Sequence, residues 1–241
     1  MKPALVLLHG WGAHHRVWDE LASRLNADRS VITPDLPGHD AVPCAIERTV
    51  DRLAAAAPAR CVVAGWSLGG QLALAWARRY PQQIARLMLI ATTPRFVATP
   101  DWPHGMAAEV FADFSVSLKR DAAGTLRRFF LLQTQGDVQA RRVARQLEAA
   151  LVLQALPGSS VLMETLRWLE TTDLRATLPE ITQPALVMHG DRDRIAPPAA
   201  GEYLAAHLPR ARLALLAGAA HAPFISDPEV MCKLMNDFCH E

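Results

Sequence analysis

Residues 61–70 read CVVAGWSLGG, an apolar run that ends in the motif G-x-S-x-G, and a helical pattern follows from Gln71 to Arg79. A serine placed between a strand and a helix in this motif occupies a sharp, strained turn, and its hydroxyl projects from the carboxyl end of the strand. Glycines on either side of Ser67 allow the neighbouring backbones to approach closely. This stretch therefore predicts a parallel α/β sheet with Ser67 as a nucleophile at its edge.

The same alternation of strand and helix patterns runs through most of the chain. Short, continuously apolar runs separated by helical patterns are typical of a mostly parallel sheet with helices on both faces. Six strands are expected, at Ala4–Leu8, Ser30–Pro34, Cys61–Gly65, Leu87–Ala91, Ala185–His189 and Arg212–Leu216. We therefore expect a single α/β domain over residues 1–241.

The alternation stops after the fourth strand, where residues 95–180 carry no strand pattern. Helical spacing appears three times in this interval, in Phe111, Phe114 and Leu118, in Leu126, Phe129, Phe130 and Gln133, and in Val143, Leu147 and Leu151. A helical insertion at one point of an α/β sheet must cover something with its apolar faces. The interval is therefore expected to be a lid.

A serine nucleophile needs a base, which is itself oriented by a carboxylate. With this type of elbow the order along the chain is serine, acid, histidine. His221 follows the last strand in GAAHAP (218–223) and suits the base better than the other histidines. The acid should lie in GDRDRIAP (190–197), where the first aspartate normally ties the turn. This favours Asp193, with Asp191 as the alternative.

The negative charge of a tetrahedral intermediate needs backbone N–H donors. We expect them to come from Leu68, directly after the serine, and from Trp11 in the loop HGWG (9–12). The sequence contains no Walker loop, G-x-G-x-x-G motif or zinc-ligand pattern. The chemistry is therefore expected to be acyl transfer to water, with no metal and no cofactor.

Composition, cysteine spacing and the N-terminal sequence bear on the cellular compartment of the protein. The chain of 241 residues is 51% hydrophobic, and 25 basic against 24 acidic side chains give a net charge of +1, which provides no general attraction to nucleic acid or membranes. The four cysteines, at positions 44, 61, 232 and 239, form no C-x-x-C pair, and the first apolar run is too short for a signal peptide. We expect a monomeric cytoplasmic protein.

Together these motifs resemble the α/β-hydrolase family over the whole chain. Within that family the chain is similar to esterases that cleave the methyl ester of a pimeloyl chain on acyl carrier protein in biotin synthesis. The similarity lies in residues 7–12, 65–70, 101–103, 128–129, 132–133, 172–175 and 219–226. It implies that the ester lies between the triad and the lid, against Trp11, Leu68, Phe129, Phe130, Leu131, Leu132 and Gln133. Family members usually carry an extra hairpin before the first strand found here, so Ser30–Pro34 is expected at the sheet edge.

The predicted lid is rich in cations. Between Lys119 and Gln146 there are seven basic and two acidic side chains, a local charge of +5. Because acyl carrier proteins are acidic, the resemblance implies that the carrier docks on this cluster, at Arg127, Arg128, Arg141, Arg142 and Arg145. The alternative for this cluster is an ordinary solvated helix face.

Two other functions stay open for the protein as a whole. It could be a general short-chain carboxylesterase, or a ligand-sensing receptor that retains the triad.

Overall fold

The computed structural model describes residues 2–25, 29–36, 45–150 and 159–241. Its sheet has six strands in the order β2-β1-β3-β4-β5-β6, and every neighbouring pair is parallel. The strands are β1 (Ala4–Leu8), β2 (Val31–Ile32), β3 (Cys61–Trp66), β4 (Ile84–Ile90), β5 (Ala185–Gly190) and β6 (Ala211–Leu216). All six predicted strands are therefore confirmed, with β2 at the edge of the sheet and shorter than predicted.

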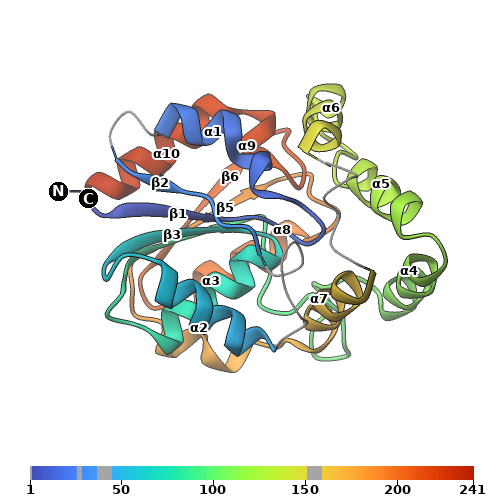
Figure 1. Cartoon of the computed structure of the whole chain (residues 1–241), viewed down its shortest axis with the longest axis horizontal. Coiled ribbons are helices and arrows are strands. Elements are labelled where there is room, and N and C mark those ends of the chain that lie inside the picture. Colours follow the sequence, from blue (N-terminus) through green and yellow to red (C-terminus); the bar gives the residue numbers. More distant parts are fainter. Residues whose placement is uncertain (1, 26–28, 37–44, 151–158) are drawn as a thin grey trace.

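Helices cover both faces of the sheet (Figure 1). One face carries α1 (Asp19–Leu25), which follows a 3-10 turn at His15–Trp18, and α10 (Pro228–His240). The other face carries α2 (Ile46–Ala56), α3 (Leu68–Arg79) and α8 (Pro198–His207), and the short α9 (Pro223–Ser226) precedes α10. The strands between these layers are apolar, and β3 is buried along its whole length. This is the α/β-hydrolase architecture that the sequence predicted.

Between β4 and β5 the structure places α4 (Ala108–Arg120), α5 (Ala122–Leu132), α6 (Ala140–Ala150), α7 (Ser159–Thr171) and a 3-10 segment at Arg175–Glu180. We call residues 95–180 the helical insertion. Its helices lie together at one side of the sheet (Figure 1). The first three agree with the predicted helical patterns, α7 was not predicted, and Leu151 lies outside the described residues. Whether the insertion works as a lid stays a prediction.

Strand register brings the predicted catalytic loops to one edge of the sheet. Leu8 at the end of β1 pairs with Gly65 of β3, so the HGWG loop starts level with the serine turn. Gly190 at the end of β5 pairs with Leu216 of β6, so the two loops that follow start side by side. Because all strands are parallel, the loops after β1, β3, β5 and β6 emerge at the same carboxyl edge.

Other expectations from composition can be compared with the described residues. Cys61, Cys232 and Cys239 are free thiols, and burial raises the pKa of Cys61 to about 11, which keeps it protonated and inert at neutral pH. Cys44 lies outside the described residues. Across the parts of the chain that are described, no helix has the length and apolar character needed to span a membrane.

Candidate active site

Ser67 stands in a strained backbone conformation between β3 and α3. Its φ of 54° and ψ of −118° lie in a region that non-glycine residues rarely adopt. The turn is held on both sides, because the Ser67 N–H donates to the Ile90 carbonyl (3.0 Å) and the Thr92 hydroxyl donates to the Ser67 carbonyl (2.6 Å). The surrounding structure thus fixes a turn that the local chain would not favour.

The glycines of the motif are required by close backbone contacts. A methyl group on Gly65 would overlap the carbonyl group of Gly69, and one on Gly69 would overlap the carbonyl oxygen of Leu8 in β1. A methyl group on Gly10 would come within 3.3 Å of Ser67 Cβ. The strand, the helix and the HGWG loop therefore meet at Ser67 with no space for larger side chains.

Asp193 and His221 form a buried pair at the same edge. The Nδ1 atom of His221 lies 2.8 Å from Oδ2 of Asp193, and both side chains are almost completely buried. The other carboxylate oxygen, Oδ1, accepts hydrogen bonds from the N–H groups of Ile195 (2.8 Å) and Ala196 (3.0 Å). The carboxylate is therefore fixed by its own loop and aimed at the imidazole.

The charge of Asp193 is stabilised by two histidines. Burial alone would raise the pKa of this carboxyl, but His221 and His189 hold the pKa below its ordinary value. His189 is fully buried in β5, with Nε2 3.4 Å from the Asp193 carboxylate and 2.7 Å from the Ala196 carbonyl oxygen. Asp193 is thus ionised at neutral pH, as an orienting acid must be, and His189 is a contact that sequence reasoning missed.

His221 is held from two directions. The Trp66 indole N–H donates to the His221 carbonyl (2.7 Å), and the His221 N–H donates to the Gln133 carbonyl in the helical insertion (3.2 Å). The imidazole lies 5.7 Å from the ring of Trp66, the residue directly before Ser67. Its Nε2 atom is buried and makes no hydrogen bond with any described residue. That atom is therefore available to take a proton from a nucleophile.

Asp191, the alternative acid, has a different position. It is exposed, and its carboxylate accepts a hydrogen bond from the Gly218 N–H (2.7 Å) at the base of the His221 loop. This bond ties two neighbouring loops together, which agrees with the turn-forming role assigned to the first aspartate. The geometry therefore favours Asp193 as the partner of the imidazole.

The expected oxyanion donors are Leu68, which directly follows Ser67, and Trp11, which follows Gly10 in the loop that packs against Ser67. Leu68 is the first residue of α3, where backbone N–H groups have no partner within the helix. The Trp11 indole N–H donates to the Leu162 carbonyl of α7 (3.2 Å), and its ring packs edge-on against Phe114 and Phe129. The oxyanion loop is thus attached to the helical insertion.

An apolar pocket surrounds the Trp11 ring, and its volume is only about 10 Å³. It is lined by Trp11, Phe96, Met106, Phe111, Phe114, Phe129, Leu166 and Leu169. This volume is close to the minimum for one water molecule. The pocket is therefore too small for an acyl chain unless side chains that line it move.

The rest of the predicted substrate-contact segment is divided between interior and surface. Phe129, Phe130 and Gln133 are buried, whereas Leu131 and Leu132 are 59% and 42% exposed. The structure therefore does not bring Leu131 and Leu132 to the aromatic pocket. The segment alternates in this way because it lies at the end of α5, where successive residues point to different sides of the helix.

The predicted docking arginines also separate into two sets. Arg127, Arg128, Arg141 and Arg145 are exposed, as the helical spacing indicated for Arg141 and Arg145. Arg142 instead lies half-buried against α1, where its guanidinium binds both carboxylate oxygens of Glu20 (2.9 and 3.2 Å). Arg142 therefore anchors the helical insertion to α1, and a docking role for it stays a prediction.

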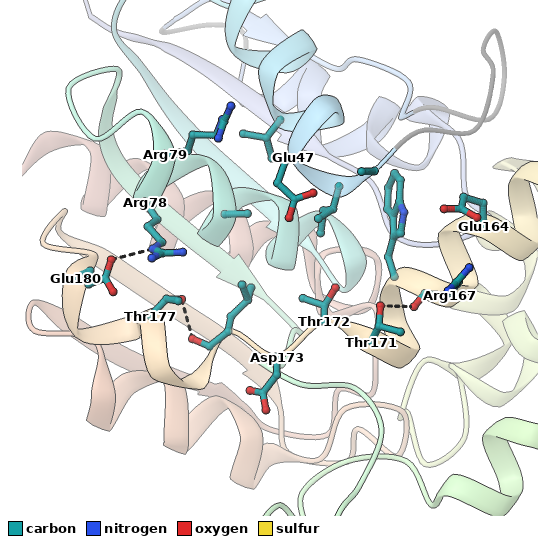
Figure 2. A pocket seen from close by; sticks show the side chains of 16 residues that line it. Glu47, Arg78, Arg79, Glu164, Arg167, Thr171, Thr172, Asp173, Thr177 and Glu180 are labelled. Carbon is teal, nitrogen blue, oxygen red and sulfur yellow. Dashed lines mark hydrogen bonds and ion pairs between the residues drawn. The ribbon is translucent and has the colours of Figure 1, made fainter.

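A cavity of about 780 Å³ lies away from these residues, between α2 and α3 on one side and the end of α7 with residues 172–180 on the other (Figure 2). Its walls carry both charges, and Arg78 forms an ion pair with Glu180 (2.8 Å) within it. Ser67, Asp193 and His221 do not line this cavity. This cavity is therefore separate from the candidate catalytic residues, despite its size.

Among the described residues, one group could hold a metal ion, formed by His14, His15 and Asp35. The Asp35 carboxylate already accepts hydrogen bonds from the backbone N–H of His15 (2.9 Å) and from its Nδ1 (2.8 Å). These bonds account for the group as a loop connection. The expectation of metal-free chemistry stays a prediction.

The fold and the site define a carboxylic ester hydrolase of the α/β-hydrolase type. Residues 5–234 match the Alpha/beta hydrolase family, and the chain belongs to that family. Two of its relatives are pimeloyl-[acyl-carrier protein] methyl ester esterases. The protein of Aromatoleum aromaticum is 44% identical, with 98% of each chain covered, and that of Xanthomonas axonopodis pv. citri is 43% identical, with 98% of this chain and 94% of the other covered.

Solved structures agree on the architecture. An enol-lactonase from Burkholderia xenovorans matches with a TM-score of 0.86 and 26% identity, covering 100% of this chain and 92% of that one. An esterase from Exiguobacterium antarcticum matches with a TM-score of 0.87 and 21% identity, covering 99% and 92%. At that identity the esterase supports the fold alone.

Substitution of each of the two loop aspartates in turn tests which one orients His221. Asp193→Asn is expected to lower kcat by roughly 10³–10⁴-fold, because the amide no longer holds the imidazole in the tautomer and orientation that a base needs. Asp191→Asn is expected to lower the melting temperature while kcat stays within about threefold, because it loses only a loop bond of about 1 kcal/mol. Steady-state kinetics and thermal unfolding of both variants measure this, and the reverse pattern would show that the acid is Asp191.

Proposed function

We propose that this protein hydrolyses the methyl ester of pimeloyl-[acyl-carrier protein], releasing methanol and pimeloyl-[acyl-carrier protein] in biotin biosynthesis. The observation that carries the proposal is the 44% identity to an esterase of that name over 98% of both chains. The buried Asp193–His221 pair beside the strained Ser67 turn supports it, because ester hydrolysis by a serine needs these groups together.

In the proposed mechanism Ser67 Oγ attacks the carbonyl carbon of the methyl ester while Nε2 of His221 takes the hydroxyl proton. The N–H groups of Leu68 and Trp11 stabilise the negative oxygen of the tetrahedral intermediate. His221 then returns the proton to the departing methoxy oxygen, which leaves methanol and an acyl-enzyme. Water attacks the acyl-enzyme by the same route, so the carboxylic acid is released and Ser67 regains its proton. Asp193 stabilises the imidazolium in both halves.

The acyl chain would lie against the aromatic pocket at Trp11. The ring contacts between Trp11, Phe114 and Phe129 give an apolar wall that suits methylene groups. Because the pocket is almost filled in this structure, substrate binding would have to displace Phe114 or Phe129.

The carrier would dock on the exposed arginines of the helical insertion, Arg127, Arg128, Arg141 and Arg145, which we call the exposed arginine cluster. Within the described ranges, Arg128 lies 3.9 Å from the Asp121 carboxylate, and the other three have no carboxylate within ion-pair distance. Exposed unpaired cations attract an acidic protein over a Debye length and orient its approach. We also propose that the enzyme is a monomer, that it works in the cytoplasm, and that it binds neither nucleic acid nor a membrane.

Turnover of matched substrates tests the proposed function. The purified protein is expected to hydrolyse the methyl ester of pimeloyl-[acyl-carrier protein] with a kcat/KM at least about 100-fold above that for free dimethyl pimelate, because the carrier adds a docking surface. Equal values would indicate a general carboxylesterase. Stoichiometric binding without turnover, even of p-nitrophenyl acetate, would indicate a receptor.

Charge reversal tests the exposed arginine cluster. Arg141→Glu with Arg145→Glu is expected to raise KM for the carrier-bound ester about tenfold and to leave hydrolysis of a free ester unchanged, because rim charges act mainly on association. The matched control is Arg48→Glu with Arg60→Glu, two exposed arginines outside the helical insertion. Added salt should act selectively on the carrier-bound ester. An equal effect on both substrates, or none on either, would show that the cluster is only a solvated face.

A further inference from the structure

Asp137 is a buried acid in the turn between α5 and α6. Its side chain is only 7% exposed, and no cation among the described residues lies within ion-pair distance. Three donors satisfy it instead: the Ala220 N–H at Oδ2 (2.8 Å), and the Ser226 hydroxyl (2.8 Å) and the Gln139 N–H (2.7 Å) at Oδ1. Burial of a carboxylate without a cation is costly unless hydrogen bonds replace its water. These three hydrogen bonds therefore replace the water that the Asp137 carboxylate loses on burial.

Two of the three donors flank His221 in the sequence. Ala220 is the residue directly before it, and Ser226 ends α9, the helix that follows it. A carboxylate bound to both fixes the beginning and the end of the segment that presents the imidazole. The third donor, Gln139, belongs to the turn that carries Asp137 itself.

Neighbouring hydrogen bonds join the same turn to the loops that carry Asp193 and His221. The Val138 N–H donates to the Gly218 carbonyl (2.9 Å), and the Arg192 guanidinium donates to the Gly136 carbonyl (3.0 Å). Together with the bond from the His221 N–H to the Gln133 carbonyl, they connect residues 133–139 to the acid loop and to the histidine loop. Asp137 is the buried charged member of this connection.

Helix capping alone does not account for Asp137. Asp121 caps α5 through the Gly124 N–H, and Asp227 caps α10 through the Val230 N–H, and both are exposed. A local turn therefore needs only one carboxylate oxygen near the surface. Asp137 is buried, and two of its three bonds reach a loop more than eighty residues away in the sequence.

We propose that Asp137 is a positioning residue for catalysis, which holds the His221 loop against the helical insertion so that Nε2 stays aligned with Ser67. The inference rests on the proposed role of His221 as the general base. Because a misplacement of about 1 Å can cost about 100-fold in rate, a loop held at both ends by one carboxylate affects the chemical step.

Asp137→Asn tests the proposal with little change in volume. One oxygen becomes an NH₂ group, so a donor then faces a donor at one or two of the three bonds. We expect kcat to fall by about 10- to 100-fold, with KM changed less than about threefold, on both p-nitrophenyl acetate and the carrier-bound ester. Asp121→Asn, the same substitution at an exposed capping aspartate of the same insertion, is the control and should keep kcat on p-nitrophenyl acetate within about twofold.

Hydrogen–deuterium exchange separates positioning from simple stabilisation. In the Asp137→Asn protein, exchange should accelerate in residues 217–226 and stay unchanged in α4 and α7. A purely structural role would lower the melting temperature and leave kcat per folded molecule unchanged at a temperature well below unfolding. That result would overturn the proposal.

Ser226→Ala keeps the proposal testable if Asp137→Asn fails to fold. It removes one donor and leaves both backbone bonds, so kcat should fall about threefold, and an unchanged kcat would overturn the proposal. If both variants fold, adding Ser226→Ala to Asp137→Asn should cause a smaller further loss than Ser226→Ala causes alone, because the two residues share one hydrogen bond. A wild-type protein that hydrolyses p-nitrophenyl acetate but not the carrier-bound ester would contradict the proposed substrate and leave this test intact.

Discussion

The structure depends on one strained residue, Ser67, and on the close packing that keeps it strained. Its positive φ persists because β3, α3 and the loop after β1 meet at glycines, with no space into which the turn could relax. The same packing places Ser67 at the N-terminal end of α3, where free N–H groups and the helix dipole favour developing negative charge. The strain at Ser67 and its position at the start of α3 therefore have a single structural cause.

Several hydrogen bonds connect the helical insertion to the loops that carry Trp11 and His221. The Trp11 indole binds the Leu162 carbonyl of α7, the Gln133 carbonyl binds the His221 N–H, and the Asp137 carboxylate binds the loop on both sides of His221. Arg142 adds an anchor to Glu20 of α1. The insertion is thus attached at several points to the loops that carry Trp11 and His221. Its α5–α6 corner is attached to the catalytic loops, whereas α4 and α7 line the nearly filled apolar pocket where space for an acyl chain would have to open.

Sequence reasoning predicted the fold and the position of the candidate catalytic residues because their signals are local. An elbow motif, two loops after apolar strands and helical spacing were sufficient to place Ser67, Asp193 and His221 at one edge of the sheet. It missed what depends on contacts between distant segments. Asp137 was counted only as an acid among cations, and Arg142 was grouped with the exposed arginines, although Glu20 lies 122 residues away in the sequence. Leu131 and Leu132 follow Phe129 closely, yet only the folded insertion shows that they face solvent.

The central claim is that Ser67 is the nucleophile and that His221 activates it. Labelling with a fluorophosphonate, followed by peptide mass spectrometry, tests this most directly, because the reagent forms a stable adduct only with an activated serine. The account predicts one adduct per chain, on Ser67, with labelling slowed by several orders of magnitude in a folded His221→Ala variant. A stable adduct on another residue, or labelling of Ser67 at an undiminished rate without His221, would contradict the account.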